Sequence, residues 1–445
     1  MEQRRGPEQE AHTRFTIKRC TVILVAIFVF FLLIGTPIAF VLGIVGLSHL
    51  AITHQLSLLP MVMQRMIDGA NNFVLVAVPM FMLAGNLMNA AGITKRLIAL
   101  SNALVGWLRG GLAHVTVVVS MIFAGITGIA TAETVALGTT LIPAMEKQGY
   151  DKRFATGLIC LASCIGPIIP PSVAMVVFSV VGEVSVGKLF ASGFLPGVMM
   201  GLSLMGLISY YSHKRNYPIH SKFSIVKLGR AFIDSFFALT MPVVMVGGLI
   251  TGFFSPTEAS AVGVSMALLL GFFVYKELKP SQLPKILWQS GRLTAAVMVL
   301  VSCAGVFSWT LSMEKVPDGV AALILSWTQN KYLFLLYVNL LLLFVGTFMD
   351  ITASIIILTP ILLPIAVQMG VDPVHFGLIM VLNLVIGCVT PPVGIILFVA
   401  CAITGLSFEE VVKSVIPFLI VAIIILMIVT YWAGGMLFLP GILFK

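Results

Sequence analysis

Three acidic residues lie within long apolar stretches of this 445-residue chain, at Glu133, Glu258 and Asp350. An ionisable side chain at membrane depth is costly, so its presence indicates a functional site. Asp350 stands close in sequence to Gly346 and Thr352. A carboxylate, a hydroxyl and free backbone carbonyls form a set of hard oxygen ligands that suits Na⁺. The alternative for Asp350 is a helix N-cap.

The other two acids also have structural alternatives. Glu133 follows a glycine-rich interruption, where it is either a functional acid or a first-turn acid favoured by the helix dipole. Glu258 lies in Ser255-Pro256-Thr257-Glu258, a pattern typical of a helix start. We therefore expect a structural role for Glu258.

These acids belong to a chain whose composition requires a membrane. Hydrophobic residues make up 59% of it and charged residues 10%, whereas soluble domains carry about 25% charged residues. A soluble enzyme and a disordered chain are both excluded. The apolar runs are long and continuous, as at 355–367 and 416–431, which excludes a β-barrel. We predict an all-α polytopic membrane protein with about nine to twelve spans or half-spans.

The net charge of +9 is divided between two segments. Basic residues gather in the N-terminal tail 1–19 and in the central loop 212–230, as expected of cytoplasmic segments under the positive-inside rule. No aromatic residues are interleaved with them for base stacking, so we predict no nucleic-acid partner. The six cysteines show no metal-ligand spacing and are predicted to be small apolar core residues.

The two halves of the chain match each other. When the sequence is shifted by 221 residues, 123–196 aligns with 344–417 without a gap, and fifteen of the 74 positions are identical. The matches include glycines, prolines and an aspartate, which chance agreement between apolar segments seldom aligns. These pairs are Gly125/Gly346, Thr131/Thr352, Pro143/Pro364, Gly149/Gly370, Asp151/Asp372, Gly166/Gly387, Pro170-Pro171/Pro391-Pro392 and Pro196/Pro417.

Each half contains two interruptions of its apolar stretches, at 124–128 and 166–171 in the first and at 346–350 and 387–392 in the second. A Pro-Pro step removes two backbone donors and frees the carbonyls upstream of it. In lipid those carbonyls must face protein, water or a bound cation. Paired, interrupted segments of this kind mark the binding site of secondary transporters. An ordinary proline kink explains one break, but not four breaks in two matched pairs.

We predict that these interruptions hold the ions and the substrate. Hairpin tips present helix N-termini, which favour an anionic substrate such as a carboxylate, with cations at the carbonyl side. The candidate Na⁺ ligands are Thr127, Gly128, Thr131, Gly166, Gly346, Asp350, Thr352, Gly387 and Thr390. The candidate substrate ligands are Gly125, Glu133, Pro170, Pro171, Ser172, Asn383, Pro391 and Pro392.

The repeat predicts the organisation of the chain. The basic tail 1–19 precedes a first half at 20–211, with a hairpin at about 113–146 and a broken helix at about 154–184. The basic loop 212–230 then leads to a second half at 231–445, with a hairpin at about 332–368 and a broken helix at about 375–405. Residues 20–50 form either one span or two helices that separate at Gly35-Thr36-Pro37.

Charge placement indicates that the two halves are inverted. Arg109 on one side and Lys147 and Lys152 on the other flank the first hairpin, so both of its ends are predicted to be cytoplasmic. That makes the hairpin re-entrant. The second hairpin is flanked by Lys331 alone and lies an odd number of spans beyond the basic loop. We expect it to be re-entrant from the outer side.

Enzymatic motifs are absent from the sequence. It contains no Gly-x-Ser-x-Gly elbow, His-Glu-x-x-His motif, Walker-type loop or Cys-x-x-Cys pair. We therefore predict that the chain is not an enzyme and that an ion gradient or a partner supplies the driving force. The alternative from another class is a channel or an intramembrane enzyme.

A series of motifs runs in order from about residue 34 to the C-terminus. They are Val78-Pro79-Met80-Phe81 with Ala84-Gly85, Leu108-Arg109-Gly110-Gly111-Leu112-Ala113, Phe123-Ala124-Gly125-Ile126-Thr127-Gly128, Ile142-Pro143-Ala144-Met145 with Gly149-Tyr150, Ile165-Gly166-Pro167-Ile168-Ile169-Pro170-Pro171-Ser172, Pro256-Thr257-Glu258-Ala259, and Asp372-Pro373-Val374-His375-Phe376-Gly377 with Thr390-Pro391-Pro392-Val393-Gly394. Together these motifs resemble the large membrane (M) subunit of TRAP transporters (tripartite ATP-independent periplasmic transporters) in the ion transporter superfamily.

The resemblance implies an elevator-type transporter in the bacterial inner membrane, in which a mobile domain with both hairpins carries Na⁺ and an organic anion across a scaffold. It implies two partners besides the lipid bilayer, a small four-helix membrane subunit and a soluble periplasmic substrate-binding protein. This chain has no room for a fused small subunit, so we expect a separate chain. Family substrates are mostly carboxylates, such as C4-dicarboxylates and sialic acid. A stand-alone Na⁺/anion symporter or antiporter of the same superfamily is the alternative.

The sequence departs from the family pattern at the first hairpin tip. Ile129 and Ala130 follow Gly128, where the family often has small hydroxyl residues. Backbone carbonyls, together with Thr127 and Thr131, are then the expected ligands of the first cation site.

Overall fold

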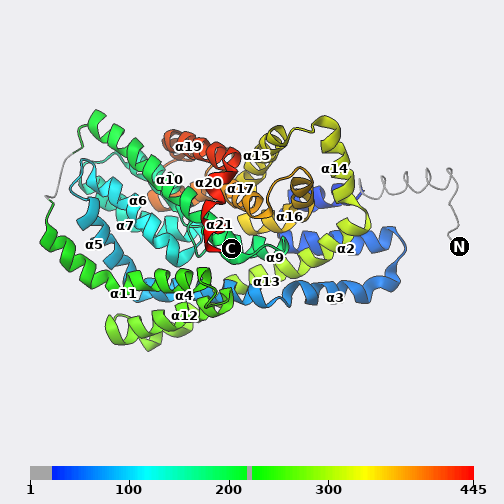
Figure 1. The fold of residues 1–445 in the computed structure, drawn as a ribbon, viewed down its shortest axis with the longest axis horizontal. Coiled ribbons are helices and arrows are strands. Elements are labelled where there is room, and N and C mark those ends of the chain that lie inside the picture. Colours follow the sequence, from blue (N-terminus) through cyan, green and yellow to red (C-terminus); the bar gives the residue numbers. More distant parts are fainter. Residues whose placement is uncertain (1–22, 218–222, 445) are drawn as a thin grey trace.

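A computed structural model describes residues 23–217 and 223–444 of the chain (Figure 1). The basic tail predicted at 1–19, the residue Cys20 and the segment 218–222 of the basic loop lie outside these described residues. The described part is built of helices and contains no strand. Eight of its helices are long and apolar enough to cross a membrane, which confirms the prediction of an all-α polytopic protein.

The described chain begins with two helices rather than one long span. The helix Ile23–Leu33 is followed by Gly35, whose φ is 84°, and by Pro37. A left-handed glycine and a proline that lacks an N–H both interrupt a helix, which accounts for the break. The next elements are α2 (Ile38–Ile52), α3 (Leu59–Ala70), the 3₁₀ turn Phe73–Val76, α4 (Ala77–Ala90) and α5 (Ile93–Val105).

Two helical hairpins follow the pattern of the repeat. Hairpin 1 consists of α6 (Gly111–Thr127) and α7 (Ala130–Lys147), and hairpin 2 consists of α15 (Lys331–Phe348) and α16 (Ile351–Gln368). α7 and α16 have equal lengths and are offset by 221 residues, the shift of the sequence repeat. A broken helix follows each hairpin. The broken helices are α8 (Lys152–Ala162) with α9 (Val173–Val181), and α17 (Pro373–Gly387) with α18 (Ile395–Thr404).

The remaining helices connect or continue these units. The longest is α13, which has 31 residues. A π-helical turn, Leu270–Val274, ends the helix that starts at Pro256. The bounds are α10 (Val186–Lys214), α11 (Ile225–Ile250), α12 (Pro256–Leu269), α13 (Leu283–Met313), α14 (Val316–Trp327), α19 (Phe408–Tyr431), α20 (Ala433–Met436) and α21 (Phe438–Leu443).

Local sequence accounts for several helix starts. Asp151 and Asp372, which the repeat matches, are the N-caps of α8 and α17. Their carboxylates accept hydrogen bonds from the N–H groups of Arg153 at 2.9 Å and Val374 at 2.8 Å. At the start of α12, Ser255 and Glu258 form a reciprocal capping box. The structural role expected of Glu258 is thereby confirmed.

The helices pack in two groups joined by two connecting helices. One group, termed the scaffold, contains α2, α3, α4, α11, α12 and α13. The other group, termed the repeat core, contains both hairpins, both broken helices, α10 and α19. α5 connects the scaffold to hairpin 1 and α14 connects it to hairpin 2. These two helices, termed the arms, lie toward opposite ends of the long axis of the molecule (Figure 1).

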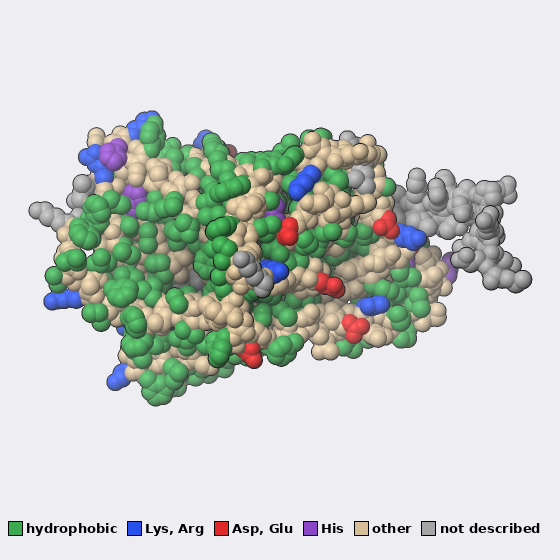
Figure 2. Space-filling view, viewed as in Figure 1, with side chains coloured by type: hydrophobic (Ala, Val, Ile, Leu, Met, Phe, Trp, Pro, Cys, Tyr) green, Lys and Arg blue, Asp and Glu red, His purple; other side chains and the backbone are tan. Residues whose placement is uncertain are grey.

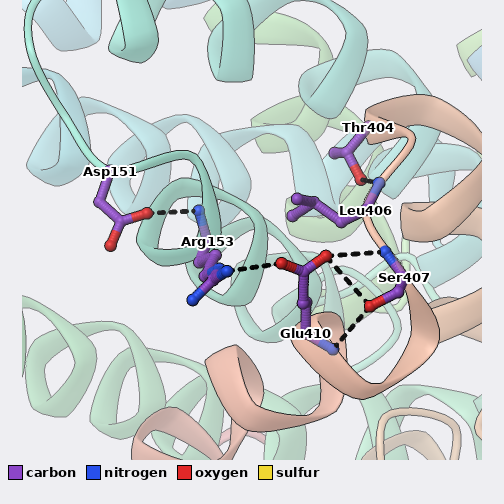
Figure 3. A network of polar contacts seen from close by, with 6 residues as sticks. All are labelled: Asp151, Arg153, Thr404, Leu406, Ser407 and Glu410. Atoms are coloured by element: carbon purple, nitrogen blue, oxygen red, sulfur yellow. Dashed lines mark hydrogen bonds and ion pairs between the residues drawn. The ribbon is translucent and has the colours of Figure 1, made fainter.

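The two halves interlock within the repeat core. α7 of hairpin 1 packs against α18 of the other half, and α16 of hairpin 2 packs against α9 in the corresponding way. An ion pair also crosses between the halves, because Arg153 donates to a carboxylate oxygen of Glu410 at 2.5 Å (Figure 3). Glu410 is held in turn by a capping box with Ser407 at the start of α19.

Apolar side chains dominate the outer surface. They cover most of the face shown in Figure 2, and charged side chains on it are few. Large apolar side chains are exposed on long helices of both groups, for example Phe232, Ile233 and Val243 on α11 and Ile420 and Ile424 on α19. Water-exposed surfaces seldom carry apolar patches of this extent, so these helices face lipid or another protein in the membrane.

Candidate functional site

The tips of both hairpins and the interruptions of both broken helices line a cavity of about 300 Å³. This volume lies within the range of about 300–1,000 Å³ that is typical of small-ligand sites. Many lining residues are related by the 221-residue shift, so the cavity lies where the two halves meet. The related pairs are Ile129/Asp350, Ala130/Ile351, Thr131/Thr352, Pro167/Cys388 and Ala174/Ile395.

Glycines bring backbones together around this cavity. Gly128, at the tip of hairpin 1, has a φ of 57°, and a Cβ there would lie 2.7 Å from the carbonyl oxygen of Pro171. The tip therefore rests directly on the first Pro-Pro step. In the second half, a Cβ at Gly387 would lie 2.7 Å from the Cα of Gly346, so α15 and α17 touch through their backbones. These positions have no room for a side chain, which accounts for the glycines.

Asp350 is both a helix cap and a lining residue. One of its carboxylate oxygens accepts a hydrogen bond from the N–H of Thr352 at 2.8 Å, which confirms the N-cap at the start of α16. The side chain is exposed and borders the cavity. A carboxylate has two oxygens and about four lone-pair sites, so the cap leaves further acceptor capacity for an ion.

The helices that begin at the cavity differ in their N-caps. Asp350 caps α16 and Ser172 caps α9, whereas Ile129 and Gly394, at the N-cap positions of α7 and α18, supply no side-chain acceptor. At the start of α18 the N–H groups of Ile396 and Leu397 are bonded to the carbonyl oxygens of Cys388 and Gly394. The start of α7 has no side-chain cap, and the helix dipole favours an anion there. The cavity thus combines one carboxylate with one uncapped helix start that attracts an anion. This arrangement can hold a cation and an organic anion side by side.

Some of the residues predicted to bind through a hydroxyl line the cavity, whereas others form hydrogen bonds with nearby backbone groups. Thr131 and Thr352 line the cavity. Thr390 instead donates to the carbonyl oxygen of Ile386 at 2.8 Å, as hydroxyls in membrane helices often do. Ser172 is buried, and its hydroxyl accepts the N–H of Met175 at 3.3 Å as the cap of α9. The side chain of Thr127 and the surroundings of Gly125 lie outside the described residues.

None of the predicted substrate ligands that the structure describes lines the cavity, and two of them, Glu133 and Asn383, are buried elsewhere. Glu133 is fully buried, and its carboxylate occupies the space that a side chain at Gly166 would need. Neither of its oxygens has a hydrogen-bond partner among the described residues. It lies on the side of α7 that packs against α8 and the 3₁₀ turn Ser163–Ile165. Asn383 is buried as well and donates to the side-chain oxygen of Asn339 at 2.8 Å, which joins α17 to α15.

The Pro-Pro steps occupy corresponding turns with unequal exposure. Pro170 and Pro171 are buried between α8 and α9, whereas Pro391 is half-buried and Pro392 is exposed. Both steps contain a cis peptide bond. The cavity is lined not by these four prolines but by Pro167, which precedes the first step.

One wall of the cavity comes from the scaffold and is entirely apolar. Met82 of α4 and four residues of α13 form it, namely Leu293, Ala296, Val297 and Leu300. No sequence motif marks these five residues. Nothing in their types or spacing separates them from the many apolar residues that face lipid or the core.

The described residues contain no group of three or more His, Cys, Asp or Glu side chains that could hold a metal ion. A Na⁺ site built from carbonyls, hydroxyls and one carboxylate differs from that pattern, and Asp350 with Thr352 supplies oxygens of this kind. Cys160, Cys164, Cys303 and Cys388 are buried, which confirms their expected place in the core.

The fold and the cavity define an α-helical membrane transporter with an internal repeat. Residues 25–434 match the family model described as "Tripartite ATP-independent periplasmic transporter, DctM component". The chain belongs to this family, whose members are the large membrane subunits of TRAP transporters. Members of this family are permease subunits and not enzymes.

Curated relatives match the chain over most of its length. The "C4-dicarboxylate TRAP transporter large permease protein DctM" of Pseudomonas aeruginosa is 38% identical over 85% of this chain and 88% of its own. The "Sialic acid TRAP transporter large permease protein SiaM" of Vibrio cholerae is 38% identical over 91% and 95%. Among solved structures, the Alcanivorax borkumensis YdaH transporter shares the fold, with a TM-score of 0.62, 14% identity and coverage of 93% of this chain and 98% of its own.

Proposed function

We propose that the chain is the membrane permease subunit of a Na⁺-coupled, binding-protein-dependent importer of organic anions in the bacterial inner membrane. Its partners are a separate small four-helix membrane subunit and a soluble periplasmic substrate-binding protein. The names of two relatives refer to C4-dicarboxylates and to sialic acid, which both carry carboxylates. A carboxylate-bearing substrate is therefore the substrate class that we propose for this chain.

The observation that carries the proposal is the position of Asp350 in one cavity with the uncapped start of α7. This helix start favours an anionic substrate, but the carboxylate of Asp350 repels it. A Na⁺ ion bound at Asp350 offsets that repulsion and adds attraction for the anion. Each ligand then strengthens the binding of the other, which is the physical basis of coupling.

An elevator movement of the repeat core against the scaffold fits the same cavity. The scaffold wall contributes apolar side chains, so the scaffold offers the substrate no hydrogen bonds that movement would have to break. The ligand-holding groups on hairpin 1 and hairpin 2 come from the repeat core. We propose that both hairpins are re-entrant, from opposite sides, and that the repeat core carries its ligands past this wall.

Reconstitution tests the proposal. The chain, its small subunit and the binding protein are placed in liposomes, and uptake of a labelled C4-dicarboxylate or sialic acid is followed with an inward Na⁺ gradient. We expect uptake only with all three components and with Na⁺. Uptake by this chain alone would favour the stand-alone carrier, and uptake that survives loss of every ion gradient would favour a channel.

Cysteine labelling tests the inverted arrangement. Lys147→Cys and Gln368→Cys place thiols at exposed, repeat-related positions at the bases of hairpins 1 and 2. An impermeant maleimide added to intact spheroplasts should label the second and spare the first. Labelling of both from one side would contradict the inversion.

A further inference from the structure

The first arm leaves the scaffold through a sharp elbow at Gly92. Gly92 has a φ of 73° and is the N-cap of α5, directly after α4 ends. The carboxylate of Glu277 occupies the space that a side chain at Gly92 would need. Glu277 follows the π-helical turn Leu270–Val274, and a Cβ at Gly271 in that turn would lie 3.1 Å from the Cβ of Ala91. The elbow is therefore packed against the end of α12.

Arg96 ties the arm to this end of the scaffold. Its guanidinium donates to Glu277 at 2.7 Å and to the carbonyl oxygen of Gly92 at 3.0 Å. The same group lies 3.8 Å from the centre of the Tyr275 ring, which is a cation–π contact. Arg96 is 23% exposed and Glu277 is 36% exposed. The side chain of Arg96 thus contacts Gly92 at the elbow and Tyr275 and Glu277 at the end of the scaffold.

The helix α11 also contacts the arm at Arg96, through the backbone of that residue. Ser235 of α11 donates its hydroxyl to the carbonyl oxygen of Arg96 at 3.0 Å. Tyr275 is fixed in turn, because its hydroxyl accepts the N–H of Ala238 at 3.1 Å. The start of α5 is thus bonded to α11 and to the segment that follows α12, and Arg96 lies outside the cavity where the ligands are proposed to bind.

The far end of α5 is built differently. The link to hairpin 1, residues 106–111, contains three glycines, and Gly110 has a φ of 75°. No ion pair of the described residues involves this link. Trp107 in this link contacts Phe223, and the centres of the two rings lie 5.8 Å apart. The glycines let the link turn sharply, and Gly110 lies against Ser212 of α10, so the far end of the arm contacts the repeat core.

The second arm also begins at an elbow. Lys315, with a φ of 52°, is the N-cap of α14, and the preceding Glu314 accepts a hydrogen bond from the ring of His49 on α2 at 2.7 Å. This contact joins α2 to the end of α13 and lies within the scaffold, directly before the second elbow. At the first elbow, by contrast, the ion pair joins the arm itself to the scaffold.

We propose that Arg96 and Glu277 form a clamp that fixes the first arm to the scaffold, so that hairpin 1 moves by bending at residues 106–111 and not at Gly92. The clamp would make the arm part of the stationary body during transport. This inference rests on the proposed transport function, in which the repeat core moves relative to the scaffold.

A charge swap tests the clamp without any transport assay. Arg96→Glu and Glu277→Arg should each lower the thermal unfolding temperature of the purified protein in detergent, and the double variant should recover most of the loss. Arg153→Glu, which breaks an Arg–Glu pair within the repeat core, is the matched control. It should not sensitise the elbow to proteolysis, whereas Arg96→Glu should. Absence of recovery in the double variant, with both singles folded, would overturn the clamp.

Tethering tests whether the elbow must open. Arg96→Cys with Glu277→Cys, joined by a short bifunctional thiol reagent, should keep at least about half of the untethered uptake. Phe81→Cys with Phe190→Cys, joined by a longer bifunctional thiol reagent, links the scaffold to the repeat core at a contact where the rings lie 6.5 Å apart. That second tether should abolish uptake. Loss of uptake in the elbow tether overturns the clamp, whereas full uptake in both tethers overturns the movement assumed by the proposed function.

Discussion

The thiol sulfur of Cys164 lies 3.7 Å from the backbone carbonyl oxygen of Val385. The two residues are 221 positions apart, so each is the repeat equivalent of the other. Contact between equivalent residues occurs where an internal two-fold axis passes, because only near the axis do two equivalent points come together. This axis runs between the two interrupted helices, beside the cavity that the hairpin tips enclose.

Close approach of backbones near this axis leads to a first prediction. Gly346→Ala should destabilise the protein by about 1–3 kcal/mol, since the new methyl group would press on the backbone of Gly387 in a packed core. Thermal unfolding in detergent measures the loss. Gly206→Ala in α10 is the control, because a Cβ there meets no atom within 4 Å. Equal stability of the two variants would show that the contact at Gly346 tolerates a side chain.

A second prediction separates the two roles of Asp350. Asn caps helices about as well as Asp, so Asp350→Asn should unfold at nearly the wild-type temperature. It removes the charge proposed to bind Na⁺, and the Na⁺ concentration for half-maximal uptake should rise about tenfold or more, equivalent to at least about 1.4 kcal/mol. Asp350→Ala should lose both the cap and the Na⁺ dependence.

Asp372→Asn is the matched control, because Asp372 caps α17 and does not line the cavity. It should keep the Na⁺ dependence of the wild type. If Asp350→Asn does the same, Asp350 is a cap and nothing more.

Much of the fold follows from patterns that are visible in the sequence. The 221-residue shift places the two tips and the two Pro-Pro steps in register, because glycine and proline are demanded by backbone geometry and are rare matches by chance. The aspartates at 151 and 372 are caps in the structure, as their place before a helical run suggests. The same repeat contains three residues that line the cavity, Thr131, Asp350 and Thr352.

The rest depends on contacts between residues far apart in sequence. Glu133 is only two residues from the lining residue Thr131, yet it faces α8, because two residues are about half a helical turn. The pair Arg96 and Glu277 joins positions 181 residues apart, and neither residue belongs to a motif. The apolar wall at Ala296 has the composition of any lipid-facing helix. Such features are set by packing, which one sequence does not display.

A third prediction concerns the helix interruptions. Replacing Pro391-Pro392 by Ala-Ala should restore backbone donors and favour a continuous helix from α17 into α18, since alanine is the best helix former. The turn in which the carbonyl oxygens of Gly387 and Cys388 accept the N–H groups of Thr390 and Ile396 would then be lost, and uptake should fall at least about tenfold. Pro170-Pro171→Ala-Ala tests the buried equivalent. Wild-type uptake rates in both variants would mean that the interruptions serve no transport role.

A fourth prediction tests the cavity through its scaffold wall. Ala296 lines the cavity and faces the hairpin tips, so Ala296→Trp should fill much of the 300 Å³ and block substrate. Ala295 is exposed and does not line the cavity, which makes Ala295→Trp a control of the same size on the same helix. Uptake in reconstituted vesicles should fall at least about tenfold in the first variant, as expected when one group excludes the ligand, and remain near wild type in the second. Both variants should unfold at similar temperatures, since neither new side chain enters the packed core. A block of uptake by Ala295→Trp, or none by Ala296→Trp, would place the substrate path on another face of α13.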